Sequence, residues 1–140
     1  MNIQGLDLSD DFVRRMRNWA RAAAGGWVSP VCAMDYGTRI DGGYREAVMP
    51  TLEGEATDTE RALSLVGMRY QQAVRQFWSY EGRTWRWHGM HRQVNHETFR
   101  GWVEKGHDEL LVVLHRHAEA HRHRAQANAR AAIGIRLNAA

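Results

Sequence analysis

Residues 91–102 read HRQVNHETFRGW and contain the clearest helix start in the chain. Asn95 is a strong N-cap residue because its side-chain oxygen accepts a backbone N–H of the first helical turn. Glu97 lies in that first turn, where the helix dipole stabilises an acidic side chain. One apolar residue, Val94, precedes the cap and another, Phe99, follows it. We therefore predict that a helix begins at Asn95 with polar residues on its outer face.

The preceding sequence, GRTWRWHGMHRQV, predicts a second, shorter helix just before this start. Thr84 is an N-cap candidate, so we expect a short helix over 84–91, a turn over 92–94 and a longer helix from Asn95 past Leu114. Two helices joined by a short turn form a helix-turn-helix, whose second helix enters the major groove of DNA. Ordinary helices begin with the same pattern, so both interpretations stay open on these residues alone.

The longer predicted helix has an apolar face and a polar face. Its apolar positions recur with the helical period at Phe99, Trp102, Val103, Gly106, Leu110 and Val113. The residues that point away from this stripe are Glu97, Arg100, Gly101, Glu104 and Asp108. A glycine in an exposed helix costs about 1 kcal/mol relative to alanine. Either another backbone approaches the helix at Gly101, or a stable helix tolerates the glycine.

The predicted turn is surrounded by basic residues, namely Arg83, Arg86, Arg92 and Arg100. Their guanidinium groups would lie beside phosphates if the second helix entered a major groove. Trp85 and Trp87 are two residues apart on the short helix, so they cannot both face inward. We expect one of these tryptophans at the surface.

Near the N-terminus, SDDFVRRMRNWARAAA predicts an amphipathic helix over residues 9–24. Ser9 is its N-cap candidate, and the Gly-Gly pair after residue 24 ends it. The apolar stripe consists of Phe12, Val13, Met16, Trp19, Ala20 and Ala23. The outer faces carry Arg14, Arg15, Arg17 and Arg21. This basic face is either solvated or available for binding.

Residues 25–57 show no sustained period and contain both prolines. The segment is either an ordered loop with a short helix over 44–49 or a flexible insertion, and no strand in it is convincing. A further helix is predicted from Thr59 to Ser79 by a single apolar stripe. We predict an all-α protein, a small helical domain with a helix-turn-helix, an N-terminal helix and a long irregular loop.

The composition limits the class of protein. The chain has 140 residues and is 44% hydrophobic, which suits one domain or two small subdomains with a shared core. A net charge of +3, carried mainly by arginine, indicates an anionic partner or a high-GC genome. Cys32 is the only cysteine, so no internal disulfide forms. With no signal sequence and no apolar run long enough for a membrane, we expect a cytoplasmic protein.

The C-terminal sequence HRHAEAHRH raises the question of a metal site. His117 and His121 lie four residues apart on one helix face, but no third ligand at helical spacing completes a closed site. We expect a helical tail, solvated or in contact with phosphate, whose alanine-rich end frays after Arg124. We expect no metal and no cofactor.

The run from Tyr70 to Leu114 resembles a sigma-factor region 4 helix-turn-helix. The resemblance rests on Arg-Thr at 83–84, on Gly89 and on VNHETF with the later Trp102. Upstream, VRRMRNWARAAAGGWVSP and TERALSLVGMRYQQAVRQFW are similar to late-gene antiterminator Q proteins of lambdoid-type phages. Together the two similarities cover nearly all of residues 9–116.

The resemblance implies a transcription antitermination factor rather than an enzyme. Such a protein binds double-stranded DNA at a phage late promoter in the bacterial host cell. It joins a paused RNA polymerase holoenzyme, which then reads through terminators. Residues 1–58 would contact polymerase, residues 59–118 would bind DNA, and residues 119–140 would form a basic tail. Arg14, Arg17 and Arg21 would contact polymerase or nascent RNA.

The DNA-binding set comprises Arg83, Thr84, Arg86, Arg92, Asn95, His96, Glu97, Arg100 and Gly101. The family's base-reading positions correspond to four of these, His96, Glu97, Arg100 and Gly101. Glu97 would accept from a cytosine amino group and Arg100 would donate to guanine.

The sequence departs from the family pattern at the short helix and its turn. His88 and Arg92 replace aliphatic residues, and Gln93 replaces a frequent glycine. Two other functions are therefore kept. One is a sigma-like or polymerase-binding regulator without antitermination. The other is a small phage nuclease, for which the central segment offers carboxylates at Asp35, Asp41, Glu46 and Glu53.

Overall fold

A computed structural model describes residues 1–25 and 53–139 of the chain, with side chains through residue 134. The predicted short helix over 44–49 lies outside the described residues. So do Cys32 and three of the four central carboxylates, Asp35, Asp41 and Glu46.

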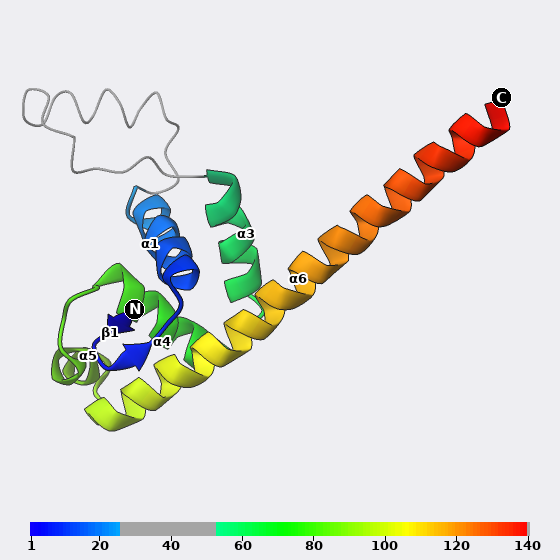
Figure 1. The fold of residues 1–140 in the computed structure, drawn as a ribbon. Coiled ribbons are helices and arrows are strands. Elements are labelled where there is room, and N and C mark those ends of the chain that lie inside the picture. The colour runs from blue at the N-terminus through cyan, green and yellow to red at the C-terminus, as the bar shows by residue number, and fades with distance from the viewer. Residues whose placement is uncertain (26–52, 140) are drawn as a thin grey trace, which may run out of the picture.

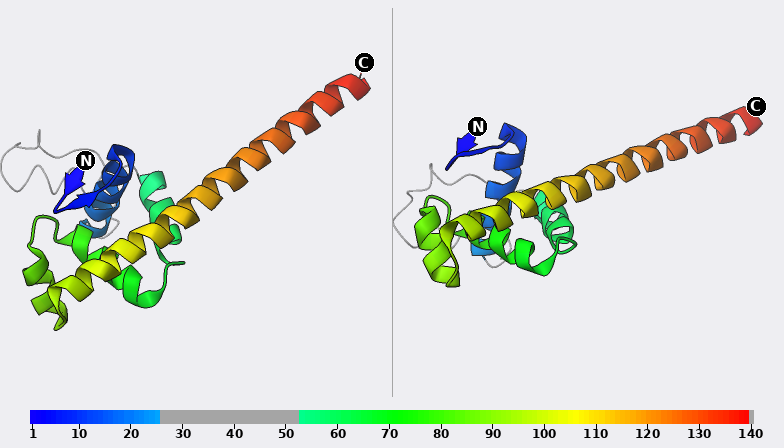
Figure 2. Two further views of the ribbon diagram at one scale, coloured as in Figure 1. Left: turned by 60° about the horizontal axis from the view of Figure 1, so that its bottom comes forward. Right: turned by 90° about the horizontal axis from the view of Figure 1, so that it is seen from below.

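The described residues are mostly helical, as predicted. In chain order the elements are β1 (Asn2–Ile3), β2 (Leu6–Asp7), α1 (Asp10–Ala24), α3 (Glu53–Leu63), α4 (Met68–Ser79), α5 (Trp85–Arg92) and α6 (His96–Ala139). The helices α1, α3, α4 and α5 gather around the first part of α6 in a rounded body (Figure 1). The rest of α6 projects from this body in every view (Figures 1 and 2).

The N-terminal helix α1 begins where its sequence predicted. The Ser9 hydroxyl accepts a hydrogen bond from the Phe12 backbone N–H at 3.2 Å. The side chains of the predicted apolar stripe are buried or half-buried against the core. Local capping and a helical apolar period are therefore sufficient to define this element.

The single helix predicted from Thr59 to Ser79 is wrong, because the chain forms two helices there. The backbone N–H groups of Leu65 and Val66 bond to carbonyls three residues back, which closes α3 with a tight final turn. At the break, the Gly67 N–H donates to a carboxylate oxygen of Glu109 on α6 at 3.1 Å. Helix α3 also begins earlier than expected, at Glu53.

The hydrophobic core joins α1 to the other helices. It includes Phe12 and Met16 of α1, Leu63 of α3, Phe77 of α4 and Phe99 of α6. All are buried in a single cluster. Consequently the core does not divide at residue 58, where the sequence analysis separated a polymerase-contacting part from a DNA-binding part.

The N-terminus forms a short hairpin that the sequence analysis missed. β1 and β2 pair antiparallel, with Ile3 opposite Leu6. The two residues between them, Gln4 and Gly5, have φ values of 51° and 88°. Positive φ at both positions is typical of a type I′ turn, and a glycine between two apolar residues was its only sequence signal.

Helix α6 continues past Arg124, after which fraying was predicted, and runs to Ala139. Alanine and arginine are among the strongest helix-forming residues, which explains the continuity. From His115 onward every described side chain through Ile133 is exposed. We call residues 115–139 the α6 extension. No helix in the described ranges has both the length and the hydropathy needed to cross a bilayer.

Candidate nucleic-acid interface

Helices α5 and α6 are joined by a tight turn at residues 93–95. The Thr84 hydroxyl caps α5 by accepting from the Trp87 N–H at 3.1 Å. Gln93 ends α5 in the left-handed conformation, with φ 59°. Asn95 then caps α6, because its Oδ1 accepts from the Glu97 N–H at 2.8 Å. Both predicted caps are confirmed, and Gln93 adopts a conformation that usually favours glycine.

Gly89 allows the two helices to approach one another. A Cβ atom at this position would lie 2.8 Å from the Val94 carbonyl oxygen and 3.0 Å from the His96 backbone nitrogen. The Val94 N–H also donates to the Gly89 carbonyl at 2.9 Å. A side chain here would push the turn away from α5.

Gln76 of α4 forms hydrogen bonds with both His88 and Arg92. The sequence did not identify this residue. Arg92 Nε donates to Gln76 Oε1 at 2.7 Å. Because an arginine only donates, this bond orients the amide, and Gln76 Nε2 then faces His88 Nδ1 at 3.0 Å. A buried glutamine thus connects His88 to Arg92.

His88 occupies a core position of the unit. Its ring is fully buried and stacks on Phe99 of α6, with ring centroids 5.1 Å apart and planes 4° apart. Burial, with a smaller contribution from neighbouring His91, lowers the pKa of His88 from 6.5 to about 4. His88 is therefore neutral at physiological pH and acts as an aromatic core side chain.

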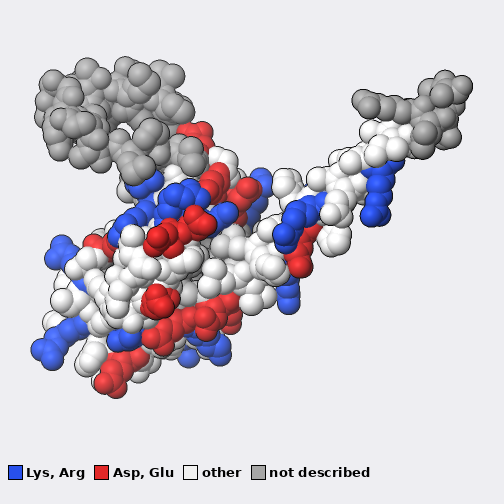
Figure 3. Space-filling view, in the orientation of Figure 1, with Lys and Arg blue, Asp and Glu red and all other residues white. Residues whose placement is uncertain are grey.

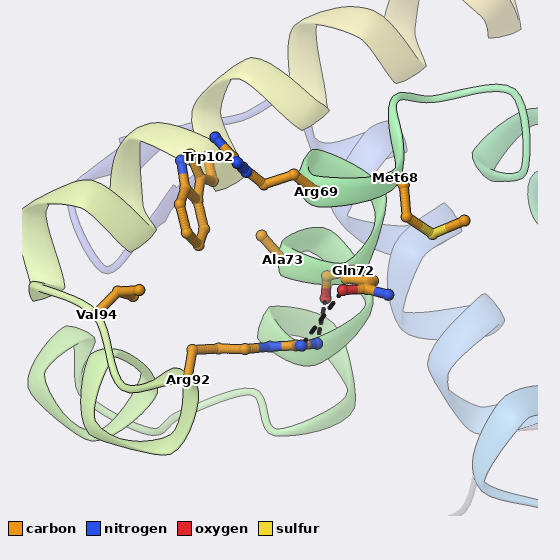
Figure 4. Close-up of a pocket in the computed structure, with 7 residues that line it drawn as sticks. All are labelled: Met68, Arg69, Gln72, Ala73, Arg92, Val94 and Trp102. Atoms are coloured by element: carbon orange, nitrogen blue, oxygen red, sulfur yellow. Dashed lines mark hydrogen bonds between the residues drawn. The ribbon is translucent and has the colours of Figure 1, made fainter.

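Arg92, a member of the predicted DNA-binding set, is exposed but hydrogen-bonded within the chain. Besides Gln76, it donates to Gln72 Oε1 at 3.4 Å. Figure 4 shows Arg92 lying along the wall of an open groove between α4 and the start of α6. This groove of about 430 Å³ is lined by Met68, Arg69, Gln72, Ala73, Arg92, Val94 and Trp102. One side of Arg92 stays exposed in the groove, while its hydrogen bonds fix the turn to α4.

Arg100 also makes polar contacts with other residues of the chain. Its Nη2 donates to the Gly5 carbonyl at 3.3 Å, and its Nε pairs with Glu104 at 3.2 Å. The guanidinium carbon lies 5.6 Å from the ring centroid of Trp85. Trp85 in turn donates to the Gln4 carbonyl at 3.0 Å. Arg100 and Trp85 thus anchor the N-terminal hairpin against α5 and α6.

Three of the predicted base-reading residues are exposed at the start of α6, namely His96, Glu97 and Gly101. A Cβ atom at Gly101 would meet nothing within 4 Å. The explanation that another part of this chain approaches Gly101 is therefore wrong for the described residues. The close helix contact is at Gly106, where a Cβ atom would lie 2.5 Å from Val74 Cγ2.

Two other residues of the predicted DNA-binding set, Arg83 and Arg86, lie at the exposed side of α5. Arg86 is exposed, and the guanidinium of Arg83 lies 5.2 Å from the ring centroid of Trp87. Trp87 also stacks on His91, with centroids 5.0 Å apart. Trp85 packs against the hydrophobic core, whereas Trp87 belongs to this surface cluster. Both tryptophans are half-buried, so the expectation that one of them lies exposed is not met, although only Trp85 packs against the core.

The arginines of α1 do not form a free basic face. Arg14 makes hydrogen bonds with both carboxylate oxygens of Glu55 on α3, at 3.1 and 3.2 Å. Arg17 binds Glu81 after α4, with a shortest distance of 2.6 Å. This hydrogen bond raises the pKa of Arg17 above its ordinary value. Arg21 is half-buried beside the same pair. Two of the three predicted polymerase-contacting charges are therefore neutralised within the fold.

The outward face of α6 within the body is acidic. Glu97, Glu104 and Asp108 are exposed along it, Arg100 pairs with Glu104, and the exposed Lys105 lies at the edge of this face. Figure 3 shows acidic side chains gathered along the body part of α6. Within the body, the acidic side chains of α6 beyond its first turn disfavour close approach to phosphates.

Among the described residues, no three histidine, cysteine, aspartate or glutamate side chains lie close enough together to hold one metal ion. Near the tail pair, His115 Nε2 lies 3.2 Å from Glu119 Oε1. Glu53, the described member of the central carboxylates, is exposed in the first turn of α3. Comparison with protein-family models, curated proteins and solved structures gives no match to this chain.

Proposed function

We propose that α5, the turn and α6 are a helix-turn-helix that binds duplex DNA, with the first turn of α6 in the major groove. The observation that carries this proposal is the tight α5–α6 connection. A buried glycine, a left-handed turn residue and two side-chain caps hold it, while the start of α6 stays exposed. A glycine-supported turn and an exposed second helix are the features that such a unit needs.

The exposed residues take different roles in this proposal. Glu97 accepts from a cytosine amino group at the floor of the groove. Arg86 and Arg83, on α5 and just before it, contact phosphates and set the register. Gly101 lets the DNA backbone or a base edge approach the helix closely. Arg92 and Arg100 support the unit, because their hydrogen bonds already join it to α4 and to the N-terminal hairpin.

We further propose that DNA binding serves transcription antitermination. The residues that resemble late-gene antiterminator Q proteins form the body itself, from α1 through the first turns of α6. The protein would bind beside a phage late promoter, join the paused polymerase holoenzyme and allow readthrough of terminators. With Arg14 and Arg17 paired, the polymerase contact is better assigned to groups that remain exposed, such as Leu65 and Met68 between α3 and α4.

A second candidate is a polymerase-binding regulator that does not read DNA. The acidic outward face of α6 favours it, because Glu97, Glu104 and Asp108 would be repelled by phosphates but suit a basic protein surface. The two candidates differ in what Glu97 contacts, a base in the first and a basic side chain in the second.

The first test is selection of duplex DNA from a random pool, followed by binding measurements on the selected site. Glu97→Gln should change the preference at one base pair by about 1–3 kcal/mol. The matched control is Asp108→Asn, which removes the same charge three turns further along the exposed face. It should leave sequence preference unchanged. If no sequence is enriched, or if both variants act alike, the chain does not read DNA through this helix.

The second test is transcription in vitro from the promoter region that binds the protein, across a downstream terminator. Antitermination predicts increased readthrough with the wild type and loss of the increase with Glu97→Gln. Binding to polymerase without any change in readthrough would favour the regulator. Metal-dependent cleavage of the template would favour the nuclease.

A further inference from the structure

The positive charge of this protein resides in the α6 extension. Of the 19 basic and 16 acidic residues, five basic and one acidic lie in residues 115–140, a net charge of +4. The remaining 14 basic and 15 acidic residues give residues 1–114 a net charge of −1. The body that carries the proposed helix-turn-helix therefore has no net attraction for a polyanion.

The two regions also differ in how their arginines are used. In the body, Arg14, Arg17, Arg75 and Arg100 each pair with a glutamate. In the extension, Arg116, Arg122, Arg124 and Arg130 are exposed and make no ion pair with any described residue. The one acidic side chain there, Glu119, lies against His115. Figure 3 shows basic side chains spaced along the projecting part of the helix.

The arginines are distributed around the helix rather than along a line. At about 100° per residue, the four positions cover an arc of roughly 200°. Alanine occupies most of the opposite side, at Ala118, Ala125 and Ala132. No phenylalanine, tyrosine or tryptophan lies between residues 115 and 134, where the only ring side chains are four histidines. A flat protein surface contacts a narrower arc than this, and single-stranded nucleic acid generally needs aromatic side chains on which bases stack.

We propose that the α6 extension is a second DNA-binding element, which binds the phosphate backbones of duplex DNA without sequence preference. The major groove is about 12 Å wide and admits a helix, with a phosphate backbone on each side. When the alanine side faces the groove, Arg122 and Arg124 at the two ends of the arc flank it and reach the two backbones. This inference rests on the proposed function only in naming DNA as the polyanion.

The extension contacts a different stretch of duplex from the first turn of α6. From Glu97 to His115 the helix advances about 27 Å, and the extension adds about 37 Å. A straight helix that enters the groove at its N-terminus has left that duplex segment well before His115, since the groove is about 12 Å wide. The extension therefore supplies affinity for neighbouring DNA, whereas the α5–α6 unit supplies sequence preference.

The test uses the full chain and a 30-base-pair duplex without the selected site. The variant Arg116→Ala, Arg122→Ala, Arg124→Ala, Arg130→Ala removes the charges and keeps strong helix formers, so the far-UV circular dichroism should be retained. The control variant has lysine at the same four positions and preserves the charge. Binding constants are measured from 50 to 200 mM salt for all three proteins.

The alanine variant should have a salt slope shallower by about 2 to 4, since each phosphate contact contributes about 0.9 to the slope. Over this salt range the wild type should lose roughly 15- to 250-fold more affinity than the alanine variant. The lysine variant should resemble the wild type. An alanine variant with wild-type affinity and slope would overturn the proposal. Tighter arginine-dependent binding to an unstructured 30-nucleotide RNA than to the duplex would overturn the assignment to duplex DNA.

The two proposals fail separately. If the extension binds DNA but α6 does not read it, the slopes change as expected while no sequence is preferred. If α6 reads DNA but the extension does not bind it, sequence preference persists and the alanine variant keeps the wild-type slope.

Discussion

Gly101 provides a test of both the stability of α6 and its approach to DNA. A Cβ atom at Gly101 would meet nothing within 4 Å, so Gly101→Ala removes only the backbone freedom of a glycine. Alanine is favoured over glycine in a helix by about 1 kcal/mol. The free energy of unfolding should therefore increase by about 1 kcal/mol, and the melting temperature should rise by about 4 °C.

The matched control is Gly106→Ala, five residues further along the same helix. Its Cβ would lie 2.5 Å from Val74 Cγ2 and 2.9 Å from the Tyr70 carbonyl oxygen, so α6 and α4 would have to separate. Overpacking of this kind costs about 1–3 kcal/mol, which is at least equal to the gain in helix propensity. The two substitutions should therefore not stabilise alike, and we expect Gly106→Ala to lower the melting temperature.

The assay combines urea unfolding of both variants with DNA binding by Gly101→Ala. If DNA approaches the helix at Gly101, the added methyl group should weaken specific binding although the protein is more stable. A less stable Gly101→Ala protein would refute the exposed position of this residue in α6. Greater stability with unchanged DNA binding would show that the glycine is merely tolerated.

Three further predictions concern the polar interior and α1. Burial lowers the pKa values of His88 and His107 to about 4, so the unfolded chain binds protons that the folded chain does not. Stability should therefore fall as the pH drops from about 6.5 towards 4, by roughly 3 kcal/mol per histidine, and the slope should be smaller in His107→Gln. Gln76→Leu should lower the free energy of unfolding by about 1–3 kcal/mol because it leaves buried polar groups unpaired, whereas the exposed Gln72→Leu should cost much less in the same urea titration. Arg17→Glu should destabilise the protein by about 1 kcal/mol by opposing its carboxylate partner, and an unchanged unfolding midpoint would show that this ion pair contributes nothing.

The sequence by itself determined the elements that depend on neighbouring residues. The caps at Ser9, Thr84 and Asn95 and the apolar period of α6 identify three helices and a turn. Capping hydrogen bonds span only two or three residues, and the helical period repeats within a few turns, so both are visible in a short window of sequence. The exposed start of α6 follows from the same local pattern.

The break between α3 and α4 could not be predicted in this way. Leu63 before the break, Val66 within it and Ala73 after it are all buried, so one continuous stripe fits one helix as well as two. The deciding contact is the Gly67 N–H with Glu109, 42 residues away. An apolar pattern reports which face is buried, but not whether the backbone between two buried residues is regular.

Only the tertiary structure decided which charges are available for binding. Arg17 finds its partner 64 residues away, and Arg100 reaches the Gly5 carbonyl across 95 residues. The same arginines look free in the sequence because opposite charges attract according to distance in space, which the order of residues does not give. In the α6 extension, no other described element packs against the helix, so its described basic side chains are all exposed, as their sequence alone would suggest.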